Sequence, residues 1–545
     1  MIFLTTLLFS VFITIALIPI TARVAGRIHL FDLPNERKVH SIPVPRVGGI
    51  AIAIGALVPL FFWIHLEDLF RWYLIGAGII ILAGFIDDVR GLDHRIKFAA
   101  QTLAALVVIF PDVVSIESVG TLLGEGTLLP NWLSVPLTLV AIVGVTNAIN
   151  LADGLDGLAG GVSLLSFCCI GLLAYLVQDR MIALLSIAMA GAILGFLRFN
   201  THPASIFMGD TGSQFLGFSA IVLSLRLTQD NPALSPLLPL LIVGFPVLDT
   251  IVVMAQRLQE KRPLFSADRN HFHHRLMRLG FYQTESVLII YILQAGLVTA
   301  ALLLRFYSEW VLLIGYLTFS VIITGLFTLA DKRAYRLKRS LGFDRIIKGK
   351  LRQLREKGTV IKPSFRVIEY GIPCLLLFTS FLPARVPRLP ACISLAAIGI
   401  MMAAWWAWRN HLDLILRGCL YLFVPYAIYA ASAEPVYWMT GTLNRCYNAS
   451  FFIFAVFIVL TMRFSRRRFG FQSTPMDFLV LFIALVVPNL PVMEIRSYHL
   501  GIMAAKTITL LYSYEVLLGE LRDQFGKVTM FTLAALAVIT AKGLF

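Results

Sequence analysis

Carboxylate and amide side chains gather at the end of one long apolar run, where the chemistry-bearing residues are densest. These residues are Asn147, Asn150, Asp153 and Asp156. The first three recur every third residue, which places them on one broad helical face, and Asp156 is expected just past the helix end. Packing alone does not explain four such side chains at an apolar helix end. We therefore interpret them as a functional cluster.

Two aspartates, Asp87 and Asp88, end another apolar run, and Lys97 begins the next one. Adjacent carboxylates at a helix C-terminus are opposed by the helix dipole. A solvated helix end explains the pair as well as a functional site does, so both interpretations stay open.

A glycine-rich motif, Met208-Gly-Asp210-Thr-Gly212-Ser213, precedes a further apolar run. Backbone amides at a helix N-terminus favour anions. Asp210 would supply a hard oxygen ligand beside them, as a Mg²⁺–phosphate site requires. Taken alone, the motif is equally consistent with an ordinary helix cap.

A histidine-rich segment contains Asp268, Arg269, His271, His273 and His274. Clustered histidines suggest zinc, but a structural zinc site needs a separated second pair of ligands that this segment lacks. We favour contact with phosphate over zinc or a solvated loop.

The elements that position these clusters are long apolar helices. The chain has 545 residues, of which 58% are hydrophobic and 14% charged, and its mean hydropathy is +0.82. Soluble domains average roughly 45–50% apolar and about 25% charged residues. The composition excludes a soluble enzyme, a disordered chain and a fibrous repeat, and it predicts an all-α polytopic membrane protein. A β-barrel would show alternating segments of ~10 residues in place of these continuous runs.

The apolar runs divide the chain into three parts: an eleven-helix core at 1–330, a basic linker at 331–366 and a C-terminal membrane region of unknown role at 367–545. The spans expected in the core are 2–22, 46–65, 70–87, 98–110, 132–152, 157–178, 181–200, 212–228, 234–256, 286–304 and 310–329. Six or seven further spans are expected near 367–383, 389–408, 412–431, 449–463, 476–493, 498–512 and 529–545.

The net charge of +15 predicts which side of the membrane each loop faces. The segment 331–366 alone holds thirteen Lys and Arg against three acidic residues. Positive loops face the cytoplasm. Counting from an outside N-terminus puts this segment and all four clusters inside, together with a first loop that carries Lys38 and His40. The basic excess is therefore explained by membrane topology, and we expect no nucleic-acid partner.

Residues 1–330 resemble the polyprenyl-phosphate N-acetylhexosamine-1-phosphate transferases, in the WecA-like branch of glycosyltransferase family 4. The resemblance rests on Asp87-Asp88, the run from Asn147 to Gly157, the Met208–Ser213 motif and the His271–His274 segment. It implies an enzyme of the bacterial inner membrane whose active site faces the cytoplasm. Such an enzyme transfers a HexNAc-1-phosphate, with GlcNAc the first expectation, from a UDP-sugar to undecaprenyl phosphate. The reaction releases UMP and initiates cell-envelope polysaccharide such as O-antigen.

The resemblance also implies site roles. Mg²⁺, or Mn²⁺ in its place, would be held by Asp210 and Asn150. Asp87 would accept the proton of the lipid phosphate with Asp88 in support, and Asp153 and Asp156 would shape the nucleotide site. The other residues expected to bind phosphate or sugar are Lys38, His40, Lys97, Asn147, Asp268, Arg269, His271, His273 and His274. The expected partners are UDP-N-acetylhexosamine, undecaprenyl phosphate, the lipid bilayer and a second copy of the chain in a homodimer.

The main alternative is a secondary transporter, since acidic residues in membrane helices often mark ion pathways. Transporter sites lie near the bilayer midplane, whereas these clusters crowd the inside ends of helices. A protein that handles lipid-linked sugars without transferase activity is a weaker alternative. The choice among N-acetylhexosamines depends on pocket geometry, which the sequence leaves open.

Overall fold

A computed structural model of the chain describes residues 2–28, 30–32, 43–64, 67–124, 126–263, 270–332, 361–407, 412–433, 435–439, 441–464, 479, 500–521 and 525–544. The chain divides into two compact units, one built from helices α1–α13 and the other from α15–α22. Lys38, His40, Asp268 and Arg269 lie outside the described residues. Residues 333–360 and most of the expected span 476–493 do so too, so the boundaries at 330 and 366 stay predictions.

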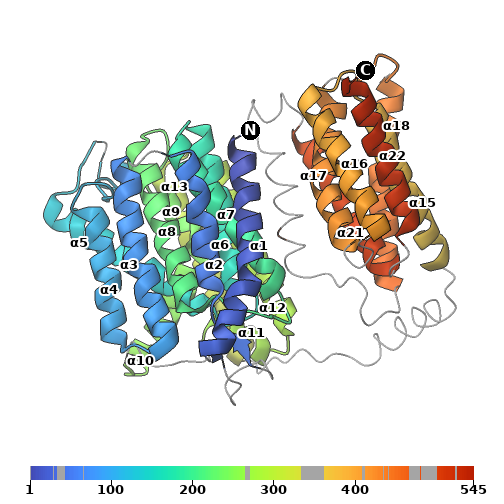
Figure 1. Cartoon of the computed structure of the whole chain (residues 1–545). Coiled ribbons are helices and arrows are strands. Elements are labelled where there is room, and N and C mark those ends of the chain that lie inside the picture. Colours follow the sequence, from blue (N-terminus) through green and yellow to red (C-terminus); the bar gives the residue numbers. More distant parts are fainter. Residues whose placement is uncertain are drawn as a thin grey trace. The chain divides into compact units, whose positions relative to one another are not determined.

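The first unit is a helical bundle with one two-stranded sheet (Figure 1). Each of the eleven spans expected here corresponds to a helix or to a broken pair of helices. The elements are α1 (Ile2–Ile28), β1 (Phe31–Asp32), β2 (Val44–Pro45), α2 (Gly48–Leu57), η1 (Val58–Phe62), α3 (Asp68–Arg90), α4 (His94–Ile109), η2 (Gly120–Leu123), α5 (Asn131–Ala152), α6 (Leu158–Leu176), α7 (Arg180–Asn200), α8 (Gly209–Asp230), α9 (Leu238–Ile242), α10 (Gly244–Gln259), α11 (Phe272–Arg278), α12 (Gln283–Leu303) and α13 (Glu309–Lys332).

The second unit contains α15 (Ile361–Phe381), α16 (Arg388–Ala407), α17 (Leu412–Ala433), α18 (Gly441–Phe464), α21 (Leu500–Leu521) and α22 (Gly526–Leu544). Six of the seven spans expected after residue 366 correspond to these helices. Arg417 on α17 donates to Asp413 one turn away at 2.9 Å and pairs with Glu515 on α21, so a charged contact ties two of its helices together.

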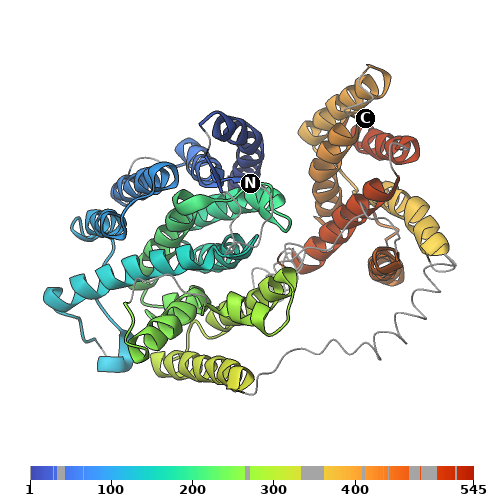
Figure 2. The same cartoon turned by 90° about the horizontal axis from the view of Figure 1, so that it is seen from below.

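The prediction of an all-α polytopic membrane protein is confirmed. In the part of the chain that the structure describes, eleven helices are long and apolar enough to cross a membrane. Among them, α6 and α7 are the most buried, with 83% and 78% of their apolar stretches inside the structure. Seen from below, α6, α7 and α8 lie between the helices α1–α4 and the helices α12 and α13 (Figure 2).

Small residues let other helices approach the first turn of α8 closely. A Cβ added to Gly84 of α3 would lie 2.6 Å from the Cα of Thr211, and one added to Gly212 would lie 2.9 Å from the Cα of Gly49 on α2. Close backbone approach at small residues is how membrane helices pack. Glycine is therefore required at these positions to bring α2 and α3 against the start of α8.

One expected span, 234–256, is broken into α9 and α10 at Val243. Pro246 lies three residues further on, and a proline ring clashes with the carbonyl four residues before it, here that of Ile242. Side chains of neighbouring helices satisfy the freed backbone groups. Gln294 donates to the carbonyl of Ile242 at 2.6 Å, and Tyr316 donates to that of Gly244 at 2.9 Å. A break inside a membrane bundle is tolerated only when such partners exist.

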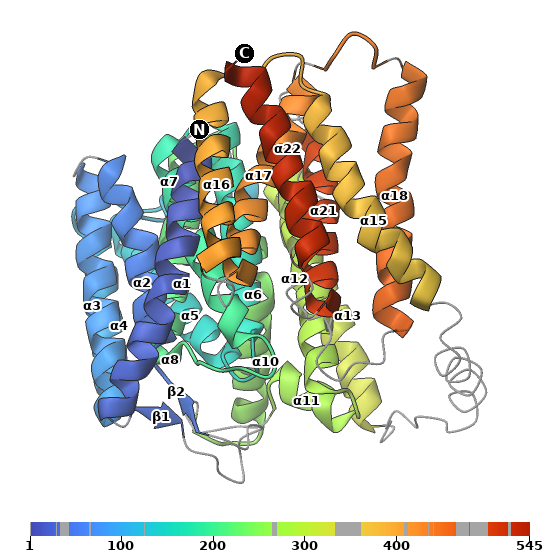
Figure 3. The ribbon, with the colours of Figure 1, turned by 45° about the vertical axis from the view of Figure 1, so that its right-hand side comes forward.

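The short sheet fixes the end of the first loop beside the segment that precedes α8. Phe31 pairs with Pro45 in antiparallel register. The chain then continues alongside Phe207, because the amides of Gly48 and Gly49 donate to the carbonyls of Phe207 and Met208, each at 2.9 Å. Figure 3 shows both strands at the end of the unit where α11 also lies.

Candidate functional site

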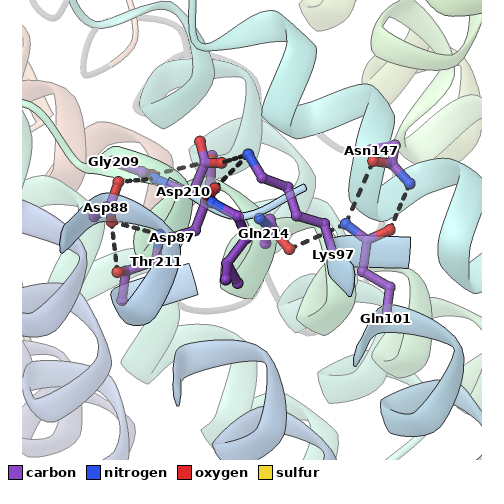
Figure 4. A network of polar contacts seen from close by, with 11 residues as sticks. Asp87, Asp88, Lys97, Gln101, Asn147, Gly209, Asp210, Thr211 and Gln214 are labelled. Atoms are coloured by element: carbon purple, nitrogen blue, oxygen red, sulfur yellow. Dashed lines mark hydrogen bonds and ion pairs between the residues drawn. The ribbon is translucent and has the colours of Figure 1, made fainter. Parts of the chain in front are cut away.

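Lys97 joins two carboxylates that come from different helices (Figure 4). Its ammonium Nζ lies 2.9 Å from Oδ2 of Asp210 on α8 and also contacts Oδ2 of Asp87 on α3. The other oxygen of Asp87 accepts a hydrogen bond from the amide of Leu92 at 2.6 Å. The Asp87 side chain is only 6% exposed, whereas those of Lys97 and Asp210 are 32% and 30% exposed. A ligand therefore reaches this cluster from the side of Lys97 and Asp210.

Asp88 points away from Lys97 and caps the first turn of α8. Its Oδ1 accepts from the amide of Asp210 at 2.9 Å, and its Oδ2 accepts from the amide and hydroxyl of Thr211 at 3.0 and 2.6 Å. The helix N-terminus does bind an anion, as the motif suggested, but that anion is the Asp88 carboxylate of the chain itself. These bonds give Asp88 a positioning role, while its support of Asp87 stays a prediction.

Gly209 makes this cap feasible. Its φ is +69°, in the left-handed region that glycine enters without steric cost. A Cβ at this position would lie 2.5 Å from Oδ2 of Asp88. The glycine therefore permits both the turn and the approach of the carboxylate.

A hydrogen-bonded chain of three amide side chains, each buried or half-buried, passes through α4 one turn after Lys97. Asn147 on α5 donates to Gln101 on α4 at 2.6 Å, and Gln101 donates to Gln214 on α8 at 3.0 Å. Each amide presents the complementary atom to its neighbour, so the layer links three helices by side-chain hydrogen bonds alone. Asn147 is half-buried and lies one turn before the end of α5. We infer that its hydrogen bond to Gln101 fixes the position of α5 relative to α4 at the site.

The end of α5 brings further carboxylates toward the same cluster. Asn150 is half-buried in the last turn, and Asp153 is the residue at which the helix ends. Burial, reinforced by the negative charges of Asp210 and Asp88, raises the pKa of Asp153 to about 7. The guanidinium of Arg46, next to β2, opposes this rise. The protonation of Asp153 is therefore coupled to the charges of Asp210, Asp88 and Arg46.

Asp156 lies just past the helix end, as expected, and meets the loop after α7. Its Oδ2 lies 2.7 Å from Nδ1 of His202 and accepts from the amide of Ala204 at 3.1 Å. The neighbouring amide of Gly157 donates to Asn200 at 3.0 Å. These contacts hold the turn after α5 against the segment that leads into α8.

The histidine segment forms a short helix, α11, where a loop was expected. His271 precedes it and is 5% exposed, with Nδ1 2.9 Å from Oδ2 of Asp249 on α10. The other oxygen of Asp249 accepts from the amide of Phe272 at 2.8 Å. Arg275 donates to Asp331 of α13 at 2.6 Å. Buried His271 therefore anchors the helix, and its predicted phosphate contact is untested.

His273 is the histidine that reaches the α5 turn. A Cβ on Gly154 would lie 2.4 Å from its Nε2, so the imidazole packs directly on the residue after Asp153. Burial, together with the neighbouring imidazoles of His274 and His271, holds the pKa of His273 well below its usual range. His273 is therefore neutral at pH 7, and His274 is the half-buried member of the three.

The donor set fits a magnesium ion that takes most of its ligands from a substrate. Within the described ranges, no three His, Cys, Asp or Glu side chains converge on one point as ligands for a metal. Mg²⁺ usually keeps several waters and is bound by one or two carboxylates plus substrate phosphates. Asp210 presents such a carboxylate on the accessible side of the cluster beside Lys97, and Asn150 offers an amide oxygen in the last turn of α5.

The structure thus brings together several of the residues that the sequence singled out, whereas Asp156 faces His202 and His271 faces Asp249 instead. Lys97 contacts both Asp87 and Asp210, the charge of Asp210 acts on Asp153, and His273 packs on Gly154 in the turn after α5. Several residues of the site were missed as site residues: Arg46, Gln101, His202, Gln214 and Asp249. Gln101, Gln214 and Asp249 could have been found as polar side chains inside apolar runs, whereas which residues they pair with could not.

Comparison with known proteins places the sequence among known transferases. Residues 70–228 match the model of glycosyl transferase family 4. The chain is 39% identical over 317 residues to a probable undecaprenyl-phosphate N-acetylglucosaminyl 1-phosphate transferase of Bacillus subtilis (strain 168), a match that covers 58% of this chain and 87% of that protein. It is 32% identical over 343 residues to the undecaprenyl-phosphate alpha-N-acetylglucosaminyl 1-phosphate transferase of Yersinia pestis, covering 62% and 93%. Over 364 residues it is 32% identical to the Escherichia coli (strain K12) protein of the same name, covering 64% and 96%.

The matched region contains Asp87-Asp88, the Asn147–Gly157 run and the Met208–Ser213 motif, which carried the resemblance in the sequence. The relatives are matched over nearly their whole length. The chain therefore belongs to glycosyl transferase family 4, in its WecA-like branch.

Proposed function

We propose that the chain transfers N-acetylglucosamine 1-phosphate from UDP-N-acetylglucosamine to undecaprenyl phosphate. The names of its relatives support this acceptor and this transferred group. The observation that carries the proposal is the meeting of Asp87, Lys97 and Asp210 at one end of a membrane bundle. Phosphoryl transfer needs positioning and charge neutralisation more than covalent chemistry from the protein, and this cluster supplies both.

The proposed step is a direct displacement. A phosphate oxygen of undecaprenyl phosphate forms a bond to the sugar-linked phosphorus of the donor. The bond from that phosphorus to the bridging oxygen breaks, and UMP leaves with the electron pair. The products are undecaprenyl-diphosphate N-acetylglucosamine and UMP, so each phosphate is accounted for. We favour this route over a covalent aspartyl intermediate.

Lys97 and Asp210 are the groups on the accessible side of the cluster, so we assign the phosphates of the donor to them. We propose Mg²⁺ as cofactor, with Asp210 and Asn150 as its protein ligands. When bound, the ion would neutralise the pyrophosphate charge. Lys97 would then hold one phosphate oxygen, and Arg46, whose charge acts on Asp88 and Asp153, is a second cation available to the substrate phosphates.

Asp87 is the proposed acceptor of the lipid-phosphate proton. It is held by Leu92 and Lys97 and is nearly buried, so its orientation is fixed before substrate arrives. A phosphate monoester has a second pKa near ~6, so much of the acceptor is ionised at pH 7. The contribution of Asp87 as a base is therefore modest, and positioning dominates.

We further propose that the site faces the cytoplasm of a bacterial inner membrane and that the product initiates a cell-envelope polysaccharide. Arg275 of α11 pairs with Asp331 near the end of α13, so α13 ends on the same side as the histidine segment. The basic segment continues directly from this end in the sequence. Basic segments stay on the cytoplasmic side, which supports the orientation.

A labelled-donor assay tests the proposal against the transporter alternative. Sealed membrane vesicles and purified full-length protein receive UDP-[¹⁴C]N-acetylglucosamine, undecaprenyl phosphate and Mg²⁺. We expect label in the organic extract with an equal amount of UMP, lost in EDTA and restored by excess Mg²⁺. Label that accumulates inside vesicles without entering lipid would instead establish transport. Faster transfer from another UDP-N-acetylhexosamine in a donor panel would identify that sugar as the substrate in place of N-acetylglucosamine.

A further inference from the structure

A cavity of about 520 Å³ lies at the end of the first unit opposite to Lys97 and Asp210. Thr228, near the C-terminus of α8, lines it, whereas Asp210 is the second residue of the same helix. At a rise of 1.5 Å per residue, about 27 Å of helix separate the two. That length is close to the ~30 Å hydrocarbon thickness of a bilayer. The cavity and the candidate transferase site therefore lie at opposite faces of the membrane.

Arg305, in the loop between α12 and α13, is a buried cation in the cavity wall. Its side chain is 9% exposed, and its Cζ lies 4.5 Å from the ring centroid of Phe306. Nη1 donates to the carbonyl of Leu302 at 2.5 Å. Its buried Nε has no hydrogen-bond partner among the described residues. An unpaired buried donor is costly, so this guanidinium is suited to an anionic ligand.

Glu309, at the start of α13, is a buried anion in the same wall and is 8% exposed. Its Oε2 accepts from the amide and hydroxyl of Thr121 at 3.1 and 2.5 Å. Gly120 leaves room for it, since a Cβ there would lie 2.6 Å from Oε1. In the described part of the chain, Glu309 forms no ion pair with Arg305 or with any other cation. Ser235 also hydrogen-bonds the Glu309 carboxylate. Two charges of opposite sign therefore line one cavity, each held by hydrogen bonds to neutral groups and, among the described residues, without an ion pair.

Aromatic side chains surround this end of the unit. Phe306, Tyr307 and Trp310 are 65%, 57% and 52% exposed, and the first two also line the cavity. Exposed aromatic residues gather at the membrane–water interface. The cavity is thus at the level of lipid headgroups.

We propose that this cavity binds a zwitterionic phosphoethanolamine group, with its phosphate at Arg305 and its ammonium at Glu309. A guanidinium is a strong partner for phosphate, and a carboxylate is one for a primary ammonium. Ser118, Gln229 and Ser235 add neutral polar groups to the lining. The group can come from a phospholipid headgroup or from free phosphoethanolamine. The inference does not depend on transferase activity.

Lipid retention by the purified full-length chain tests this site. The protein in detergent is titrated with dioleoyl-phosphatidylethanolamine, with the phosphatidylglycerol and phosphatidylcholine analogues, and with free phosphoethanolamine, and bound molecules are counted by native mass spectrometry. We expect phosphatidylethanolamine to bind about tenfold tighter than phosphatidylglycerol, as one additional charge-assisted contact provides. Phosphatidylcholine should also bind less, because its methylated ammonium donates no hydrogen bond to Glu309.

Arg305→Gln should remove binding, and Glu309→Gln should remove the preference over phosphatidylglycerol. Arg71→Gln is the matched control, since Arg71 begins α3 at the same membrane face and pairs with Asp68 at 2.6 Å outside the cavity lining. Displacement of the lipid by free phosphoethanolamine would support a soluble source of the group, and resistance to it would support a lipid source. Equal retention of all three lipids by the unaltered chain, or a preference that survives Arg305→Gln, would overturn the proposal. The comparison of the three lipids uses only the unaltered chain, so it tests the proposal even if a variant fails to fold.

Discussion

Asp88 and Thr211 are joined by two hydrogen bonds, from the amide and from the hydroxyl of Thr211, both to Oδ2 of the carboxylate. Asp87, the adjacent residue, instead faces Lys97. Two neighbouring aspartates of one helix thus have different tasks: one fixes the start of α8 and so the position of Asp210, and the other takes part in the charged cluster.

Replacement of Asp88 by Asn should act mainly on stability. The amide group presents one acceptor where the carboxylate presents two, so a buried N–H of the α8 cap loses its partner, at a cost of about 1–3 kcal/mol. We expect a lower melting temperature in a thermal unfolding scan. Asp68→Asn, at the exposed opposite end of α3, is the control and should leave the melting temperature unchanged. An Asp88→Asn protein that melts like the unaltered chain would refute the capping role.

Replacement of Asp87 by Asn should leave a transferase whose activity recovers as the pH rises. A proton acceptor matters only for the fraction of lipid phosphate that is still protonated, and this fraction falls above its second pKa near ~6. The ratio of variant to unaltered kcat should therefore increase between pH 6 and pH 8.5. A pH-independent ratio would show that Asp87 is not the proton acceptor.

Replacement of Lys97 by Met should lower kcat/KM strongly, by roughly 100-fold or more, because a preorganised cation beside the reacting phosphates is lost. Lys97→Arg should retain part of the activity, since the charge persists. Arg95→Met is the matched control, because Arg95 is an exposed cation two residues earlier on α4. If Lys97→Met is as active as this control, Lys97 takes no part in the reaction.

Asp153 should make the metal-free protein less stable as the pH rises. Its folded-state pKa of about 7 lies above the unfolded value of ~3.9, so the unfolded state releases the proton first. This contribution to stability is fully present below pH ~4 and is lost progressively up to pH ~7. In EDTA, Asp153→Asn should therefore melt above the unaltered chain at pH 8, by a gap that shrinks at pH 5. A gap that is constant across this range would contradict the assignment of the pKa.

The convergence of Asp87, Lys97 and Asp210 could be predicted, because each stands at the same end of an apolar run and the positive loops fix the sidedness. The division of labour between Asp87 and Asp88 could not. It depends on which way each side chain leaves α3 relative to α8, and no periodicity of the sequence reports that. The Asp249–His271 pair was missed for the same reason, because only the tertiary structure brings the two residues, 22 positions apart, into contact.

The break between α9 and α10 was not predicted either, although Pro246 is visible in the sequence as a residue that interrupts helices. Hydropathy continues through Val243 and Gly244, and the break persists because Gln294 and Tyr316 satisfy the exposed backbone. Such partners come from helices distant in sequence. The glycines at 84, 209 and 212 were visible, but the need for them follows only from the close approach of α2, α3 and Asp88 to the start of α8.

The most direct test follows the phosphorus. UDP-N-acetylglucosamine labelled with ³²P in the sugar-linked phosphate is supplied with undecaprenyl phosphate and Mg²⁺ to the purified full-length chain and to its Asp210→Ala variant. The account predicts that the label moves into the lipid fraction with unlabelled UMP released in equal amount, and that Asp210→Ala abolishes the transfer. Label that stays in water-soluble UDP while the sugar enters the lipid, or full transfer by the Asp210→Ala variant, would contradict it.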